Sequence, residues 1–162
     1  MTEEQHVELE ELPPQPVLSI RATIPVARLG DTMGERIRVL SQFLRERGVQ
    51  PAGPPFVRYH TFGETDTDME FGVPVTEPTA GDGEVVGGEL PGGSAATTWH
   101  LGAHDRLGEA YGRIERWRRE HGREPAGPGW EVYQWIDLGA SGESTSQPDP
   151  STWRVQLVQP IR

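Results

Sequence analysis

The fold is decided by a stretch that occurs twice, DTMGERIRVLSQFLRERGVQPAGPPFVRYH at residues 31–60 and DRLGEAYGRIERWRREHGREPAGPGWEVYQ at residues 105–134. A shift of 74 positions aligns the two stretches without a gap, and 11 of the 30 aligned pairs are identical. The shared pattern is DxxGE, an amphipathic segment, and then RExGxxPAGPxxxxY. Repetition at a fixed spacing indicates that one structural unit is used twice. We therefore interpret the chain as an internal duplication.

Each copy predicts a helix that ends at a glycine. In the first copy, Asp31 is a suitable N-cap, apolar side chains follow at helical spacing, and Gly48 fits the position just after the last turn. In the second copy, Asp105 and Gly122 hold the same positions. The sequence thus predicts two helices of roughly sixteen residues each, both starting at the shared aspartate.

Short runs rich in β-branched and aromatic residues surround both helices, which predicts strands. These runs are residues 17–23, 56–60 and 69–75 around the first helix, 95–101, 130–136 and 153–161 around the second, and 84–90 between the copies. The unit is strand–helix–strand–strand, used twice. We therefore expect an α+β domain with an antiparallel sheet, two main helices, and a pseudo-two-fold seam between the copies.

A length of 162 residues suits a single domain. Residues 1–14 contain five Glu and no Arg, and we expect them to form a flexible acidic tail. Residues 15–162 would then form the domain, with one repeat at about 16–76 and the other at about 84–162.

Composition excludes several classes of chemistry. The chain has no Cys and no Lys, which excludes thiolate metal sites, a Cys nucleophile, a Walker-type phosphate loop and a Schiff-base lysine. His100 and His104 have metal-like spacing, but Gly102 lies between them at a strand end, so we expect no metal and no cofactor. The net charge of −10 argues against direct nucleic-acid binding, and no apolar run is long enough for a membrane helix. We expect a cytoplasmic protein.

The two copies differ most informatively at one strand position, where Val57 of the first copy corresponds to Glu131 of the second. Side chains alternate along a strand, so Glu131, Tyr133 and Trp135 share one face. A carboxylate among aromatic rings could pair with a cationic aromatic ligand or act as a general base. It could also be a solvent-facing edge residue or a partner of an Arg, and the strand pattern alone leaves these alternatives open.

At these residues the chain resembles the GyrI-like domain, which also forms the effector-binding domain of some AraC- and MerR-type transcription regulators. The matching motifs are VPV at 73–75, GGELPGG at 87–93, TTWHLGAHDRLGEAYGRIERW at 97–117 and PAGPGWEVYQW at 125–135. The resemblance covers roughly residues 16–161. It implies two strand–helix–strand–strand repeats that form a central ligand cleft. Because residues 1–14 cannot supply a helix-turn-helix, the chain resembles the stand-alone members of the family.

The resemblance also implies a function. The family binds bulky, hydrophobic, often cationic aromatic compounds around a buried glutamate, a place that Glu131 occupies here with Tyr133 beside it. The further lining residues that the pattern suggests are Tyr59, Phe71, Trp99, Trp135 and Trp153. Two alternatives remain open. One is hydrolysis of cyclopropane-bearing electrophiles, with Glu131 as general base and Tyr133 or Tyr59 orienting the leaving side. The other is an interaction with DNA gyrase through the acidic surface.

Overall fold

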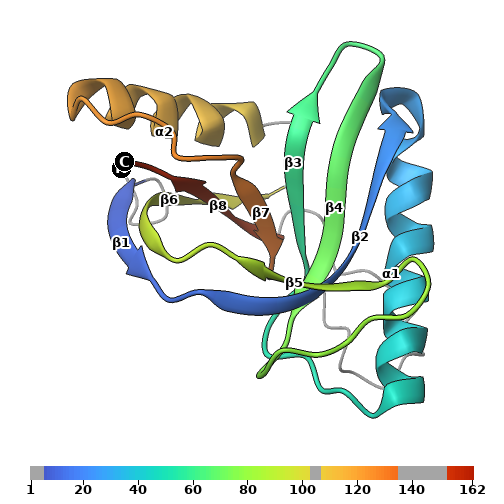
Figure 1. Cartoon of the computed structure of the whole chain (residues 1–162). Coiled ribbons are helices and arrows are strands. Elements are labelled where there is room, and N and C mark those ends of the chain that lie inside the picture. The colour runs from blue at the N-terminus through green and yellow to red at the C-terminus, as the bar shows by residue number, and fades with distance from the viewer. Residues whose placement is uncertain (1–5, 103–106, 135–152) are drawn as a thin grey trace.

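The computed structural model describes residues 6–102, 107–134 and 153–162, in which two α-helices pack on one face of an eight-stranded antiparallel sheet (Figure 1). The predicted α+β class is therefore confirmed. The elements are β1 (Glu8–Leu12), β2 (Gln15–Pro25), a 3-10 helix (Val26–Arg28), α1 (Leu29–Arg47), β3 (Phe56–Phe62), β4 (Asp66–Pro74), β5 (Val86–Leu90), β6 (Gly93–Leu101), α2 (Leu107–Glu120), β7 (Trp130–Tyr133) and β8 (Arg154–Pro160).

The strand order of the sheet reflects the two copies. The order is β1-β6-β8-β7-β3-β4-β2-β5, and the predicted unit is found as β2-α1-β3-β4 and as β6-α2-β7-β8. The two units meet where β3 pairs with β7. Outward from this junction, one side of the sheet runs β3, β4, β2 and the other runs β7, β8, β6, which are the corresponding strands of the two units. A pseudo-two-fold axis at the junction would produce this order, and the symmetry itself stays a prediction.

Both helices end as the sequence predicts, but the first begins earlier. Gly48 and Gly122 adopt left-handed backbone conformations with φ of 65° and 61°, which a glycine reaches without steric cost. Asp31 lies inside the first turn of α1 and is not its N-cap, because the 3-10 helix Val26–Arg28 leads directly into Leu29. Asp105 lies outside the described residues.

Part of the segment that we predicted as a flexible tail forms strand β1, which pairs with β6 at one edge of the sheet. The glutamates of β1 take part in this pairing. Glu10 accepts a hydrogen bond of 2.6 Å from the Thr97 hydroxyl, and Glu11 accepts one from Ser94. These bonds join side chains of the two strands in addition to the backbone pairing, and the acidic composition of β1 makes this edge strand less attractive to further strands.

The sheet rolls up strongly at one end. Only Pro13 and Pro14 connect β1 to β2, although five strands separate these two in the sheet. In a flat sheet the two strands would lie about 29 Å apart at a spacing of about 4.8 Å, whereas a link of this length reaches about 11 Å. The link Pro91–Gly92 joins β5 to β6 across five strands in the same way. The sheet is consequently a half-barrel whose two short links meet at one end.

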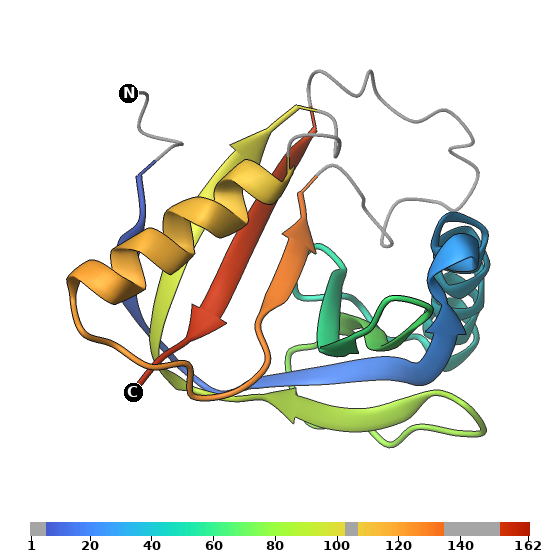
Figure 2. The same cartoon turned by 90° about the horizontal axis from the view of Figure 1, so that it is seen from above.

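Two hydrophobic cores lie on the two faces of this sheet. The larger core fills the space between the sheet and the helices, with Leu40 of α1 and Ile114 of α2 among its members, and we call this side the helix face. In Figure 2, α1 covers the β2 side of the sheet and α2 the β6 side. The smaller core contains Phe56, Trp130 and Val158 and lies on the other side, which we call the opposite face.

Candidate functional site

The candidate site lies at the junction of the two copies, on the helix face. Val57 and Glu131 are direct partners across the β3–β7 pairing, and the row continues outward through buried neighbours on both sides. All six members of the row are at most 4% exposed: Ile20, Phe71, Val57, Glu131, Leu157 and Thr98. Glu131 is the one ionisable side chain in this row, so a carboxylate stands where the first copy has a buried valine.

The Glu131 carboxylate is held by two tyrosine hydroxyls. Tyr133, two residues further along β7, donates a hydrogen bond of 2.6 Å to Oε1, and Tyr111 of α2 donates one to Oε2. Tyr133 is 2% exposed, whereas Tyr111 is 45% exposed. One donor is therefore part of the sheet core, and the other is partly exposed to solvent.

A third tyrosine extends this arrangement. Tyr59 of β3 is half-buried and its hydroxyl hydrogen-bonds with that of Tyr133. Because Tyr133 gives its single proton to Glu131, the proton in the bond with Tyr59 comes from Tyr59. Tyr59 and Tyr133 hold the same position in the two copies, so both copies contribute a tyrosine. The carboxylate is present in the second copy alone. We call these four residues, Tyr59, Tyr111, Glu131 and Tyr133, the carboxylate–tyrosine cluster.

Burial controls protonation in this cluster. Loss of solvent raises the pKa of Glu131, and the hydrogen bonds from Tyr111 and Tyr133 offset only part of that effect. Burial and the nearby negative charge of Glu131 raise the pKa of all three tyrosines, Tyr59, Tyr111 and Tyr133. The tyrosines consequently remain protonated hydrogen-bond donors at neutral pH, and Glu131 takes up a proton more readily than an ordinary glutamate.

Among the described residues, the potential negative charge of the cluster has no matching positive charge. Within residues 6–102, 107–134 and 153–162, no arginine or histidine forms an ion pair with Glu131. The sequence left open that Glu131 is an edge residue in solvent or the partner of an Arg. Neither alternative describes Glu131 among the described residues. An unpaired buried carboxylate is costly, and either a proton or a cationic group would reduce that cost.

The structure brings some of the other predicted site residues to the helix face and not others. Phe71 is 1% exposed and lies in the row of Glu131, one strand beyond Val57. Trp99 pairs with Gln156, which in turn pairs with Val132, so the Trp99 side chain stands on the opposite face and not beside Glu131.

Two further tryptophans were expected at the site. Trp153 is half-buried, directly precedes β8, and accepts a hydrogen bond of 2.8 Å from the Gly102 amide through its backbone carbonyl. Trp135 lies outside the described residues. Roles in ligand binding for these residues stay predictions.

Sequence reasoning missed Tyr111, which lies within the predicted second helix and was not named as a site residue. A comparison of the two copies could have pointed to Tyr111, because the 74-residue shift aligns it with Ile37, a residue of a different type. The copies thus differ at two positions, with Glu131 where the first copy has Val57 and Tyr111 where it has Ile37. In the second copy these two side chains are hydrogen-bonded to each other.

Among the described residues, no three His, Asp or Glu side chains come together as a metal site, and no helix there has the length and apolar character to cross a membrane. His104, one of the two histidines with metal-like spacing, is not among those residues.

In this chain two sequence repeats share one antiparallel sheet, and a buried carboxylate lies where they meet. The sequence matches the family described as GyrI-like small molecule binding domain over residues 5–134. The chain belongs to this family. A search of curated proteins finds no match.

Solved structures with the same fold include regulator domains. The C-terminal domain of EcmrR is 22% identical with a TM-score of 0.81, and 97% of each chain is covered. EcmrR in a complex with DNA is 23% identical with a TM-score of 0.78, and here the match covers 97% of this chain and 57% of the EcmrR chain. The chain therefore spans little more than half of that regulator.

Two further solved structures with this fold are of a protein with a bound ligand and of a hydrolase. SAV2435 bound to tetraphenylphosphonium is 11% identical with a TM-score of 0.63, covering 97% of this chain and 94% of that one. A hydrolase encoded by lin2189 from Listeria innocua is 10% identical with a TM-score of 0.65, covering 98% and 93%. At these identities the likeness concerns the fold.

Proposed function

We propose that this small-molecule binding domain takes up hydrophobic cationic aromatic compounds on its helix face, with Glu131 as the counter-charge. The observation that carries the proposal is the burial of Glu131, at 4% exposure, without a basic partner among the described residues. Buried ionisable groups with perturbed pKa values cluster at sites that a ligand or a reaction uses.

The surroundings of Glu131 favour a large, flat or ring-bearing cation over a small hydrated one. Val57 and Phe71 lie in its row, the hydroxyls of Tyr111 and Tyr133 donate to its carboxylate, and Tyr59 bonds with Tyr133. Apolar and aromatic surface contributes to binding when a ligand with a poorly hydrated, delocalised or shielded charge replaces water. SAV2435, which shares the fold, is described with such a compound, tetraphenylphosphonium.

Protonation strengthens this selectivity. Because the pKa of Glu131 is raised, the empty cluster can hold the carboxyl group in its neutral form at a modest cost. A bound cation would favour the ionised form, so the proton leaves as the cation arrives. A neutral ligand of similar shape gains nothing from this exchange. The cluster would therefore discriminate by charge as well as by shape.

The experiment compares a cation with a neutral analogue in two proteins. Tetraphenylphosphonium and triphenylphosphine oxide are titrated calorimetrically into the wild-type chain and into Glu131→Gln, which keeps the shape of the side chain. We expect Glu131→Gln to weaken phosphonium binding at least about tenfold, or 1.4 kcal/mol, and to change binding of the neutral oxide little. Equal phosphonium affinity in the two proteins would overturn the proposal.

A second candidate function rests on the same four side chains. A carboxylate with a raised pKa and adjacent tyrosine donors also suits a general base that activates water against an electrophilic ligand. Incubation with a cyclopropane-bearing alkylating compound, followed by mass spectrometry, tests this candidate. A ring-opened product that has gained one water, formed over many turnovers and lost in Glu131→Gln, would support it. Recovery of the intact compound would exclude it for that substrate. An interaction with DNA gyrase stays a prediction.

A further inference from the structure

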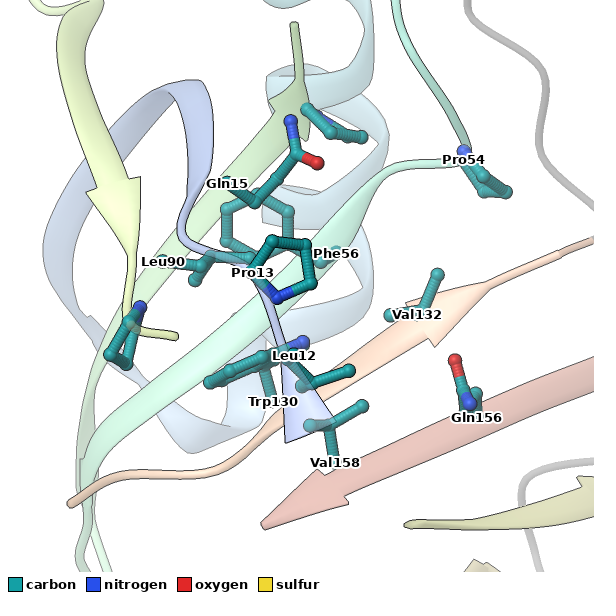
Figure 3. A pocket seen from close by; sticks show the side chains of 12 residues that line it. Leu12, Pro13, Gln15, Pro54, Phe56, Leu90, Trp130, Val132, Gln156 and Val158 are labelled. Carbon is teal, nitrogen blue, oxygen red and sulfur yellow. The ribbon is translucent and has the colours of Figure 1, made fainter. Parts of the chain in front are cut away.

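A separate apolar cavity lies on the opposite face of the sheet, at the rolled end of the half-barrel (Figure 3). Its volume is about 210 Å³, and its walls come from strands that are far apart in the chain. The side chains that contribute most of the apolar wall are Leu12, Phe56, Leu90, Trp130, Val132 and Val158. None of the cavity-lining residues carries a charge.

The cavity is a product of the two short links between strands. Leu12 and Pro13 stand at the β1–β2 link, and Leu90 and Pro91 stand at the equivalent β5–β6 link. The links touch each other, because a Cβ atom on Gly92 would lie 2.7 Å from the Pro14 ring. Strand pairing and link contact thus hold the rim in place, so the cavity is a built feature of the fold.

The polar groups at this cavity are few and uncharged. The Gln15 amide nitrogen donates to the carbonyls of Pro16 at 3.0 Å and Val75 at 2.8 Å, which fixes the side chain and leaves its oxygen available as an acceptor. Gln156, on β8, forms no side-chain hydrogen bond with the residues that the structure describes, and Figure 3 shows its amide at the cavity. An apolar wall with one or two amides that can orient a ligand is typical of a small-molecule site.

We propose that this cavity binds a neutral, mostly apolar molecule of about two fused rings with at most one hydrogen-bonding group. The size follows from the volume, since an apolar cavity of about 150 Å³ stays dry and takes up benzene. The neutral character follows from the uncharged lining, because a charged ligand would lose its hydration without gaining an ionic partner. The rings of Phe56 and Trp130 offer surfaces for an aromatic or alicyclic ring.

The cavity is independent of the carboxylate–tyrosine cluster. Along β7, Glu131 and Tyr133 point to the helix face, whereas Trp130 and Val132 point to the opposite face. One strand therefore separates two environments of different chemistry, one ionisable and one neutral. The present proposal stands even if the helix face binds no cation.

The test uses 2-naphthol as the probe and methyl-resolved NMR as the reading. Titration into the wild-type chain should shift saturably the methyl signals of Leu12, Leu90 and Val158, and leave those of Leu40 and Ile114 on the helix face unchanged. Val132→Phe and, as a second variant, Gln156→Phe fill the cavity and should each weaken 2-naphthol binding at least tenfold. Unchanged melting temperatures would exclude misfolding as the cause.

The matched control is Glu131→Gln, which should bind 2-naphthol as the wild-type chain does. The two cavity-filling variants should in turn bind tetraphenylphosphonium with wild-type affinity if the helix face takes cations. The proposal would be overturned by non-saturating shifts, by shifts confined to the helix face, or by equal 2-naphthol affinity in well-folded Val132→Phe and Gln156→Phe.

Discussion

Val57 and Glu131 face each other across the central strand pair of the sheet, and they are the same position in the two copies of the repeat. Their neighbours pair reciprocally, Phe56 with Val132 and Arg58 with Trp130, as expected if a two-fold axis passes between them. A duplicated scaffold would place two identical side chains there. Glu131, where the first copy has a valine, instead gives the buried row at the junction a single carboxylate, and Tyr111, where the first copy has Ile37, gives that carboxylate a donor.

The free energy of unfolding should carry the signature of Glu131. Its pKa in the folded chain is raised above the unfolded value of about 4.3, so the folded state keeps the proton to higher pH. The contribution of Glu131 is thus most favourable below the unfolded pKa and is lost as pH rises through the folded pKa. Glu131→Gln lacks this loss, so its stability relative to the wild-type chain should increase across that window in urea titrations.

Glu115, on the surface of α2, provides a control whose effect on stability should change with pH in the opposite direction. Arg118 lowers the pKa of Glu115, so the stabilisation from that carboxylate is present above its unfolded pKa and is lost on acidification. Glu115→Gln should consequently lose stability relative to the wild-type chain as pH rises. Parallel pH profiles for the Glu131→Gln and wild-type chains would contradict the assignment of Glu131 as a buried group with a raised pKa.

Affinity for a permanent cation should depend on pH in a related way. The cation favours ionised Glu131, so tetraphenylphosphonium should bind more weakly as pH falls through the raised pKa of the empty site. Calorimetry in buffers of different ionisation enthalpy should show proton release in the same pH range. The neutral triphenylphosphine oxide should show neither effect. A phosphonium affinity independent of pH over this range would argue against an ionic role for Glu131.

Tyr133→Phe should weaken cation binding because Tyr133 donates directly to Oε1 of Glu131 from a fully buried position. A hydrogen bond to a charged group contributes about 1.5–3 kcal/mol, so we expect a loss of roughly tenfold or more in phosphonium affinity. Tyr59→Phe is the matched control, because its hydroxyl bonds with Tyr133 and reaches Glu131 only through it. A larger loss for Tyr59→Phe than for Tyr133→Phe would contradict this order.

Gly92→Ala should destabilise the chain, because its Cβ would lie 2.7 Å from Pro14 and 2.9 Å from the Leu12 carbonyl oxygen where the two links meet. Such overpacking costs about 1–3 kcal/mol. Gly34→Ala, within α1 and with nothing within 4 Å of the added Cβ, should instead stabilise by up to about 1 kcal/mol. Equal unfolding free energies for the two variants would show that the links do not meet as described.

Much of this architecture could be predicted from the sequence because the duplication repeats its signals. Two amphipathic segments ending at Gly48 and Gly122, with strands around them, suffice to predict the unit and its double use. The start of α1 could not be predicted in the same way, because the 3-10 helix before Leu29 carries no distinct capping residue. Strand β1 depends on pairing with a strand more than eighty residues away, a relation that local patterns do not contain.

The site could be predicted in part. Alternation along a strand correctly grouped Glu131 with Tyr133, but it shows only which residues share a face and not which face that is. Trp99 therefore could not be assigned, and the structure places it on the opposite face. Tyr111 escaped because an aromatic residue at a core-facing helical position is usually read as packing, and its hydroxyl matters only once Glu131 is known to lie opposite.

The most direct test of the account is a crystal structure of the chain soaked with tetraphenylphosphonium. We predict density for the cation on the helix face above the β3–β7 junction, with a phenyl ring in van der Waals contact with the Glu131 carboxylate and with Tyr59 or Tyr133. A cation bound only elsewhere, with the Glu131 carboxylate still enclosed by Tyr111 and Tyr133, would contradict the account.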